Sequence, residues 1–324
     1  MTQLFRNACL GLSLALATGT ACAQNVGAAQ PYPSKPIRIV APGIGGSADF
    51  VARMMAQGLT SNNGWQVIVD NRANGVVPGE IVSRATPDGY TLLLTTNSLW
   101  VGPLMSDNTP YNPARDFTPI VLATVSPNVL LVYPGLPAKS VKELVDLARA
   151  KPGQLNYGSG ATGASSHLAA ELMKSMASIN MVRIPYKSNA AQIADLMAGQ
   201  IQLFFSNATA APPHMKSGKL RGLAVTSGQA SRLFPELPPI SATVPGYDSV
   251  GMAGAFGPAR MPPAMVTRLN QEIIRALDRP DIKDKFNAAG IEAVGGTPQH
   301  FASTIKAEVI KWGKIIKDAG IREE

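Results

Sequence analysis

Residues 37–60 read IRIVAPGIGGSADFVARMMAQGLT, and this stretch decides the fold class. The apolar run over 37–41 ends at Pro42 and is typical of a short buried strand. A glycine-rich loop follows, and apolar side chains then recur at helical spacing over 49–60. Strand-like runs at 65–70 and 90–94 complete a β-α-β order. We therefore predict an α/β fold in which helices cover a parallel sheet.

The middle of the chain repeats this plan. Ser140 and Glu143 have the spacing of a capping box for a helix that stops at Pro152. Another helix is expected after Ser165, and three more towards the C-terminus. The other predicted strands are 155–157, 181–185, 201–205 and 222–226, and the other predicted helices are 190–198 and 210–217.

This repetition predicts two α/β lobes. We expect one lobe to combine residues 35–127 with 252–324 and the other to hold residues 128–251. Short crossing segments near 125–131 and 249–256 would join them.

The N-terminus has the pattern of a secretory leader. Arg6 precedes a short apolar run, and Ala21, Cys22 and Ala23 form a small-x-small cleavage pattern. We predict a signal peptide over 1–23, cleaved near Ala23, then a linker over 24–34, so that the mature chain lies in the periplasm. Cys22 leaves open a lipid-anchored variant. Because Cys9 and Cys22 both lie in the leader, the mature chain would have no thiol.

Charge and histidine spacing argue against several functions. The net charge is +8, but the basic residues are scattered and do not interleave with aromatic residues, so we expect no nucleic-acid partner. His167, His214 and His300 lack metal-ligand spacing. There is no Gly-x-Ser-x-Gly elbow. We expect neither catalysis nor a metal, and no cofactor.

Two glycine-rich loops share one design. Each lies between a predicted strand and a predicted helix, at 43–47 and at 158–166. The first N–H groups of a helix have no intrahelical partner and carry partial positive charge, so they can bind a carboxylate without a cationic side chain. Two such loops, one in each lobe, predict an anion held across a cleft. The candidate contacts are Gly43, Ile44, Gly45, Gly46, Ser47, Thr162, Gly163, Ala164 and Ser165.

Polar residues at strand ends are further candidates. Asn97 and Ser98 follow the strand at 90–94, and Ser206 and Asn207 follow the strand at 201–205. Ligands of open α/β sheets bind beyond the carboxyl ends of strands.

The first loop also permits a second interpretation. Gly43, Gly45 and Ala48 match the spacing of a dinucleotide fingerprint, and Asp70 ends the next strand, where a ribose-binding acid would lie. This pattern would indicate an NAD-dependent oxidoreductase. The leader argues against it, because the periplasm does not supply free nicotinamide cofactor.

Several short motifs, in order, carry a family resemblance. They are Tyr32-Pro33-Ser34-Lys35-Pro36-Ile37-Arg38, Asn71-Arg72, Pro87-Asp88-Gly89-Tyr90-Thr91-Leu92-Leu93, Asp116-Phe117-Thr118-Pro119-Ile120, Leu155-Asn156-Tyr157-Gly158-Ser159, Ser166-His167-Leu168-Ala169, Pro185-Tyr186-Lys187 and Gly218-Lys219-Leu220-Arg221. With these motifs the chain resembles the tripartite tricarboxylate transporter receptors, the TctC/Bug group of extracytoplasmic solute-binding proteins.

The resemblance implies a two-lobed, type II periplasmic-binding-protein fold with the ligand in the interdomain cleft. It implies a small organic carboxylate as ligand, held by backbone N–H groups at 43–47 and 162–165, with Asn97 and Asn207 lining the cleft. It also implies the membrane permease subunits of a tripartite transporter as partners, and we expect a monomer. A carboxylate-sensing receptor for a signalling system is the alternative.

The chain departs from the family pattern at three places that border the cleft. Gly43-Ile44 replaces a Phe-containing stretch, the run 73–79 is shorter and more apolar, and Ser206 stands where the family often has an acid. An amino-acid ligand would need an acid for its ammonium group. These departures suggest a bulkier or more apolar carboxylate.

Overall fold

Strand–loop–helix units make up much of the computed structural model, which describes residues 32–72, 76–106, 108–160, 163–186 and 188–321. Lys35–Glu324 form one compact body. Within it, we call the region around β1 to β3 the first unit and the region around β5 to β7 the second unit. The predicted leader, with Cys9 and Cys22, lies outside the described residues.

The first unit forms as the sequence predicts. Strand β1 (Ile37–Pro42) lies between β2 (Val67–Arg72) and β3 (Thr91–Thr96), and all three are parallel. Helix α1 (Ser47–Asn63) follows β1 after the first glycine-rich loop and contacts all three strands. Helix α2 (Val76–Ser83), which the sequence did not predict, contacts them as well.

The second unit has the same order of elements. Strand β5 (Asn156–Ser159) runs parallel to both of its neighbours, β6 (Val182–Pro185) and β7 (Leu203–Asn207). Helix α6 (Ser165–Ala177) follows β5 after the second glycine-rich loop. The other elements here are α5 (Val141–Ala150), α7 (Asn189–Met197), α8 (Ala211–Lys216), β8 (Arg221–Val225) and the 3-10 helix η2 (Ile240–Ala242).

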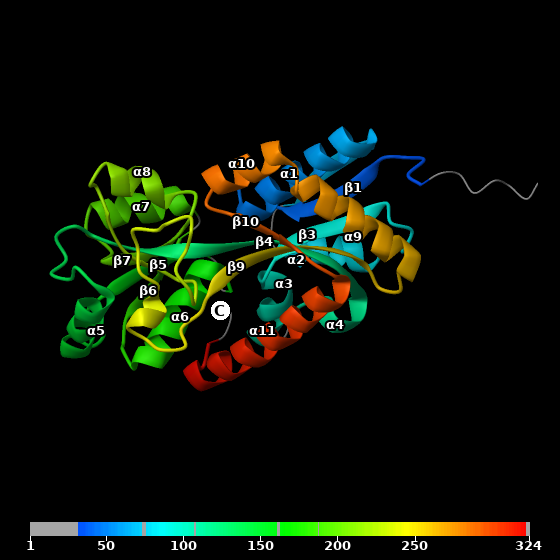
Figure 1. The fold of residues 1–324 in the computed structure, drawn as a ribbon. Helices are drawn as coiled ribbons and strands as arrows, with labels where there is room; N and C mark the ends of the chain where they lie inside the picture. Colours follow the sequence, from blue (N-terminus) through cyan, green and yellow to red (C-terminus); the bar gives the residue numbers. More distant parts are fainter. Residues whose placement is uncertain (1–31, 73–75, 107, 161–162, 187, 322–324) are drawn as a thin grey trace, which may run out of the picture. The chain divides into compact units, whose positions relative to one another are not determined.

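One long strand, β4 (Phe117–Val132), belongs to both units (Figure 1). From Phe117 to Pro127 it pairs with β9 (Val250–Pro258), and from Asn128 to Val132 it pairs with β7 and β8. Strand β10 (Glu292–Gly295) also pairs with β4. All of these pairings are antiparallel. The β-α-β strands are parallel as predicted, but these antiparallel partners, which the sequence did not predict, make the sheet as a whole mixed.

The C-terminal helices cover the first unit, and all three were predicted. They are α9 (Pro263–Leu277), α10 (Pro280–Ala288) and α11 (Pro298–Ala319). Helix α9 packs on α1, and α11 contacts both α3 (Ser98–Val101) and α6 (Figure 1). The short elements η1 (Gly102–Leu104) and α4 (Pro113–Asp116) complete the order.

An aromatic cluster anchors the core of the first unit. The ring centroid of Phe256 lies 4.9 Å from that of Phe301 and 6.0 Å from that of Trp100. All three side chains are at most 2% exposed. Because Phe256 comes from β9 and Phe301 from α11, their packing ties the end of the chain to the sheet.

Candidate ligand-binding site

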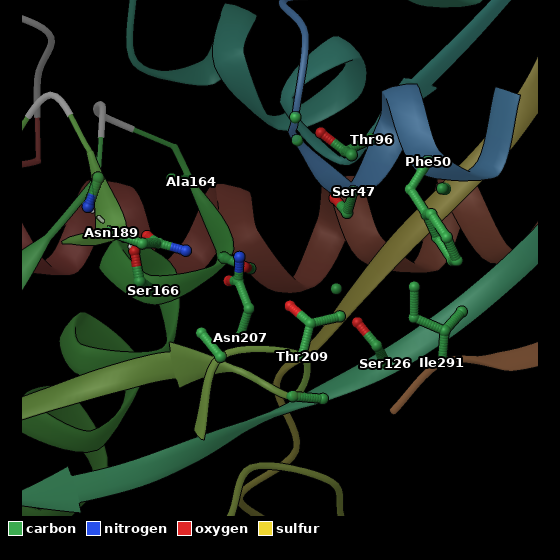
Figure 2. Close-up of a pocket in the computed structure, with 18 of the residues that line it drawn as sticks. Ser47, Phe50, Thr96, Ser126, Ala164, Ser166, Asn189, Asn207, Thr209 and Ile291 are labelled. Carbon is green, nitrogen blue, oxygen red and sulfur yellow. Dashed lines mark hydrogen bonds between the residues drawn. The ribbon is translucent and has the colours of Figure 1, made fainter. Parts of the chain in front are cut away.

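A cavity of about 1250 Å³ opens where the two glycine-rich loops approach each other (Figure 2). The first loop and the start of α1 line one side of the cavity. The starts of α6 and α7 and the end of β7 line another side. The β4–β9 pair forms the floor between them. The lining residues are Gly43, Ile44, Gly45, Gly46, Ser47, Phe50, Thr96, Asn97, Thr124, Ser126, Gly160, Ala164, Ser165, Ser166, Pro185, Tyr186, Ser188, Asn189, Gln192, Asn207, Ala208, Thr209, Ala210, Gly251, Met252, Ala253, Ala289 and Ile291.

Two of the helices that begin at this cavity, α1 and α6, lack a side-chain cap at their N-cap residues. The N-cap residues are Gly46 for α1 and Ala164 for α6, and neither has a side-chain atom that could accept a hydrogen bond from the helix. By contrast, Ser140, Ser188 and Thr297 each accept a backbone N–H at the start of α5, α7 and α11. The first-turn N–H groups of α1 and α6 therefore depend on some other acceptor.

Three of the loop N–H groups already have partners. The Gly45 N–H donates to Asp49 Oδ2 at 3.0 Å, the Gly160 N–H donates to Ser166 Oγ at 3.0 Å, and the Gly163 N–H donates to His167 Nδ1 at 3.2 Å. Gly163 was a predicted ligand contact, but it is buried and does not line the cavity. The loops therefore offer fewer donors than the sequence suggested.

Asp49 is the buried centre of a polar network behind the first loop. Besides the Gly45 N–H, it accepts hydrogen bonds from Asn71 Nδ2 and Arg53 Nε, both at 2.9 Å. Burial alone would raise the pKa of Asp49, but the bonds from Gly45, Arg53 and Asn71 outweigh it and hold the pKa below the ordinary value. Asp49 is therefore an anion at the N-terminus of α1.

His167 occupies the corresponding position behind the second loop. Its side chain is 2% exposed. Burial, reinforced by the positive charge of Arg183, lowers the pKa of His167 to about 4. The imidazole is therefore neutral near pH 7, and its Nδ1 accepts the Gly163 N–H. This agrees with a histidine satisfied at a helix start.

The remaining predicted contacts divide into two groups. Asn97 and Asn207 line the cavity, whereas Ser98 and Ser206 do not. The amide of Asn97 also holds β9, since it donates to Val250 O at 3.2 Å and accepts from the Met252 N–H at 3.1 Å.

The other two side chains have local roles. Ser98 pairs with Thr96 at 3.1 Å between hydroxyl oxygens, and Ser206 is fully buried. Thr162 lies outside the described residues.

The geometry does not support the dinucleotide interpretation. The carboxylate of Asp70 accepts hydrogen bonds from Arg38 and Arg72. The Asp70 carboxylate does not line the cavity, so it is not placed to bind a ribose beside the first loop.

Several lining residues were missed by the sequence reasoning. Phe50 is one of the apolar side chains that recur at helical spacing over 49–60, yet its ring borders the cavity (Figure 2). Thr124 and Ser126 face the cavity from β4, and Ile291 faces it from the turn before β10. The polar residues Thr124 and Ser126 within a mostly apolar strand were a usable signal, whereas nothing local marks Ile291.

The cavity residues that the structure describes are all uncharged. No Asp, Glu, Lys, Arg or His is among the described residues that line the cavity. Within the described ranges, no group of three or more His, Cys, Asp or Glu side chains could hold a metal ion. No helix in the part of the chain that the structure describes is long and apolar enough to span a membrane.

Comparison with known proteins identifies relatives along almost the whole chain. A UPF0065 protein from a Pseudomonas species is 34% identical over 316 residues, covering 96% of this chain and 93% of that protein. BugT of Bordetella pertussis is 32% identical and covers 91% of this chain and 92% of its own length.

Two solved structures have backbones that superpose closely on this chain. R. palustris Rpa4515, solved with adipate, is 34% identical with a TM-score of 0.80, and the match covers 90% of this chain and 99% of that one. The periplasmic binding protein BugD is 27% identical with a TM-score of 0.78, covering 90% and 100%. Both comparisons support the predicted two-lobed fold.

The family model described as "Tripartite tricarboxylate transporter family receptor" matches residues 51–321. With relatives above 30% identity along nine tenths of its length, the chain belongs to this family of periplasmic solute-binding receptors, which are not enzymes.

Proposed function

We propose that this receptor captures a small organic carboxylate in the cavity between the starts of α1 and α6. The observation that carries the proposal is a large cavity whose described lining residues are all uncharged, at which α1 and α6 begin without side-chain caps. Peptide N–H groups at such helix starts bind anions directly. The 34% identical relative that was solved with adipate supports a carboxylate ligand.

The proposed binding cycle uses two lobes, residues 35–127 with 252–324 and residues 128–251. The change of partners along β4, between Pro127 and Asn128, supports this division. The open form binds the carboxylate, and closure of the lobes brings the second loop onto the ligand and expels water. A monomer then delivers the ligand to the membrane subunits of a tripartite permease. Export by a leader cleaved near Ala23 would place the receptor in the periplasm.

Isothermal titration calorimetry of the processed chain tests this function. The titrants are linear and aromatic carboxylates of two to ten carbons, each paired with its primary amide. A charge-assisted hydrogen bond contributes about 1.5–3 kcal/mol, against about 0.5–1.5 kcal/mol for a neutral one. At least one carboxylate should therefore bind at micromolar concentration and at least tenfold more tightly than its amide.

Two outcomes contradict the proposal. Either no carboxylate binds, or an amide binds as tightly as the acid from which it is made.

A further inference from the structure

We infer that Arg183 is a positioning residue for the ligand carboxylate: from behind the second glycine-rich loop it holds the loop backbone and supplies positive charge at the start of α6, without lining the cavity. The inference rests on the proposed function, because it concerns the ligand of the same cavity. It names a residue that the sequence analysis did not single out. It also explains how a cavity whose described lining is uncharged can prefer an anion.

Arg183 reaches the loop along one face of the sheet. It lies in β6 directly opposite Tyr157 of β5 in the parallel ladder, so the two side chains lie on the same face. This face is the one that α6 covers, because the Tyr157 hydroxyl donates to the carboxylate of Glu171 in α6. Arg183 therefore extends on the α6 side of the sheet, towards the end of β5.

Two hydrogen bonds from Arg183 fix the loop where it leaves β5. Arg183 Nε donates to Ser159 Oγ at 2.7 Å, and Arg183 Nη2 donates to Gly160 O at 3.0 Å. The buried Ser159 hydroxyl also donates to Gly160 O, at 3.1 Å, and the Gly160 N–H donates to Ser166 Oγ. Because Gly160 lines the cavity, Arg183 helps to fix backbone that faces the ligand.

The shape of the guanidinium suits this contact. Its Nε–H and Nη2–H belong to one rigid planar fork, so a single side chain can hold two acceptors at once. Both acceptors, Ser159 Oγ and Gly160 O, are uncharged oxygen atoms. These two bonds therefore hold the loop without neutralising the positive charge.

The positive charge of Arg183 acts at the start of α6. His167 lies in the first turn of α6, and its Nδ1 accepts the Gly163 N–H of the loop. Burial and then the charge of Arg183 lower the pKa of His167 to about 4. A positive potential that disfavours an imidazolium at this position favours a carboxylate there.

The other charged groups near this helix start do not cancel the effect of Arg183. Glu171 is 6% exposed and is paired with Lys174 Nζ at 2.8 Å. Among the charges that act on the pKa of His167, that of Arg183 has the largest effect, ahead of Glu171 and Lys174. The net field of these side chains at His167 is therefore positive.

Four variants separate the charge of Arg183 from its hold on the loop. Arg183→Lys keeps the charge but not the two-point fork, Arg183→Gln keeps a donor without the charge, and Arg183→Met removes both. Arg149→Met is the matched control. Arg149 Nη2 also donates to a backbone carbonyl, that of Ala177, but at the far end of α6, about 18 Å from its start.

The first experiment is isothermal titration calorimetry of the processed chain with adipate, hexanoate, benzoate and their amides, with competition titrations where an amide binds weakly. Any tighter acid of the series above joins the panel. Arg183→Gln and Arg183→Met should lose at least about fivefold affinity for the acid relative to the amide. Arg183→Lys should weaken acid and amide by the same factor, because only the hold changes. Arg149→Met should change the ratio by less than about twofold, because its charge lies beyond a Debye length.

The second experiment needs no ligand. NMR titration of the His167 imidazole measures its pKa in the wild type and in each variant. The pKa should rise in Arg183→Gln and Arg183→Met, and it should stay close to the wild-type value in Arg183→Lys and Arg149→Met. A purely structural role of Arg183 would not produce this order.

Four results decide the matter. Equal losses of acid and amide affinity in Arg183→Gln overturn the inference and leave the proposed function intact. An unchanged pKa of His167 in Arg183→Gln overturns it as well, and so does an equally large change of the acid-to-amide ratio in Arg149→Met. If no carboxylate binds the wild type, the proposed function fails and the inference with it. The comparison of Arg183→Lys with Arg183→Gln is sufficient even if Arg183→Met does not fold.

Discussion

At the scale of single residues, several N–H groups of the glycine-rich loops donate to side chains that lie four or six residues later in the chain. Asp49 takes the Gly45 N–H and His167 takes the Gly163 N–H, each from the next helical turn. Ser166 takes the Gly160 N–H in the same way. The receptor thus satisfies part of each glycine-rich loop internally, which holds the loop in shape before any ligand arrives.

His167 should make stability depend on pH in a defined window. Its pKa falls from 6.5 to about 4 on folding. Between these values the unfolded chain binds a proton that the folded chain does not, so the free energy of unfolding decreases as pH falls from 6.5 to 4. The shift corresponds to about 3 kcal/mol.

Urea denaturation between pH 7 and pH 4 measures the contribution of His167 to the free energy of unfolding. The wild type is compared with a His167→Asn variant, whose amide oxygen can still accept the Gly163 N–H. The wild type should lose about 3 kcal/mol more than the variant over this range. Parallel curves for the two proteins would show that His167 is not the group responsible.

At the scale of secondary-structure elements, helix α1 both lines the cavity and packs against a neighbouring helix. Its N-terminus faces the cavity, and its C-terminal half packs closely on α9. A Cβ atom on Gly58 would lie 2.6 Å from the Cβ atom of Ala276 in α9. Glycine at this position lets the two helices approach, and the orientation of α1 over the sheet depends on that contact.

Two glycine-to-alanine changes inside helices should therefore have opposite effects. Gly58→Ala forces α1 and α9 apart and should lower the free energy of unfolding by about 1–3 kcal/mol. Gly313→Ala in α11 meets nothing within 4 Å. It should raise the free energy of unfolding by about 0.5–1 kcal/mol, because alanine has the higher helix propensity. Chemical denaturation compares both variants with the wild type. A stabilised Gly58→Ala would contradict the close α1–α9 contact.

At the scale of the whole molecule, β4 connects the two halves of the receptor. Its Phe117–Pro127 part belongs with β9 and β10, and its Asn128–Val132 part with β7 and β8. Thr226 reinforces the junction, since its Oγ1 accepts the Asn128 N–H at 2.7 Å and its own N–H donates to Asn128 O at 2.9 Å. Bending of β4 and β9 near this junction is the simplest way for the proposed lobes to close.

Closure predicts that a bound carboxylate compacts and stabilises the processed chain. Small-angle X-ray scattering should show a smaller radius of gyration at saturating ligand. At a ligand concentration one hundred times Kd, the free energy of unfolding should rise by about 2.7 kcal/mol. The control is the Ser165→Pro variant, which lacks one peptide N–H at the start of α6 and is measured at the same ligand concentration. Calorimetric binding without any change in scattering would argue against closure.

The sequence alone determined the local units. An apolar run, a glycine-rich loop and a helical apolar pattern predicted β1–α1 and β5–α6, and the motifs predicted the family. These signals are local, because strand, turn and helix preferences act over a few residues. The acceptors Asp49 and His167 were also close in sequence to their donors, and an acid in a first helical turn is a recognised signal.

Only the tertiary structure decided how these units combine. The antiparallel pairing of β9 with β3 and β4, the continuous strand through Pro119 and Pro127, and the position of Ile291 at the cavity depend on contacts between distant parts of the chain. Such pairings follow from the burial of whole faces and from long-range backbone hydrogen bonds, which no short segment encodes. The sequence therefore identified the two glycine-rich loops that precede α1 and α6, and the assembled fold determined which of their N–H groups have acceptors within the chain.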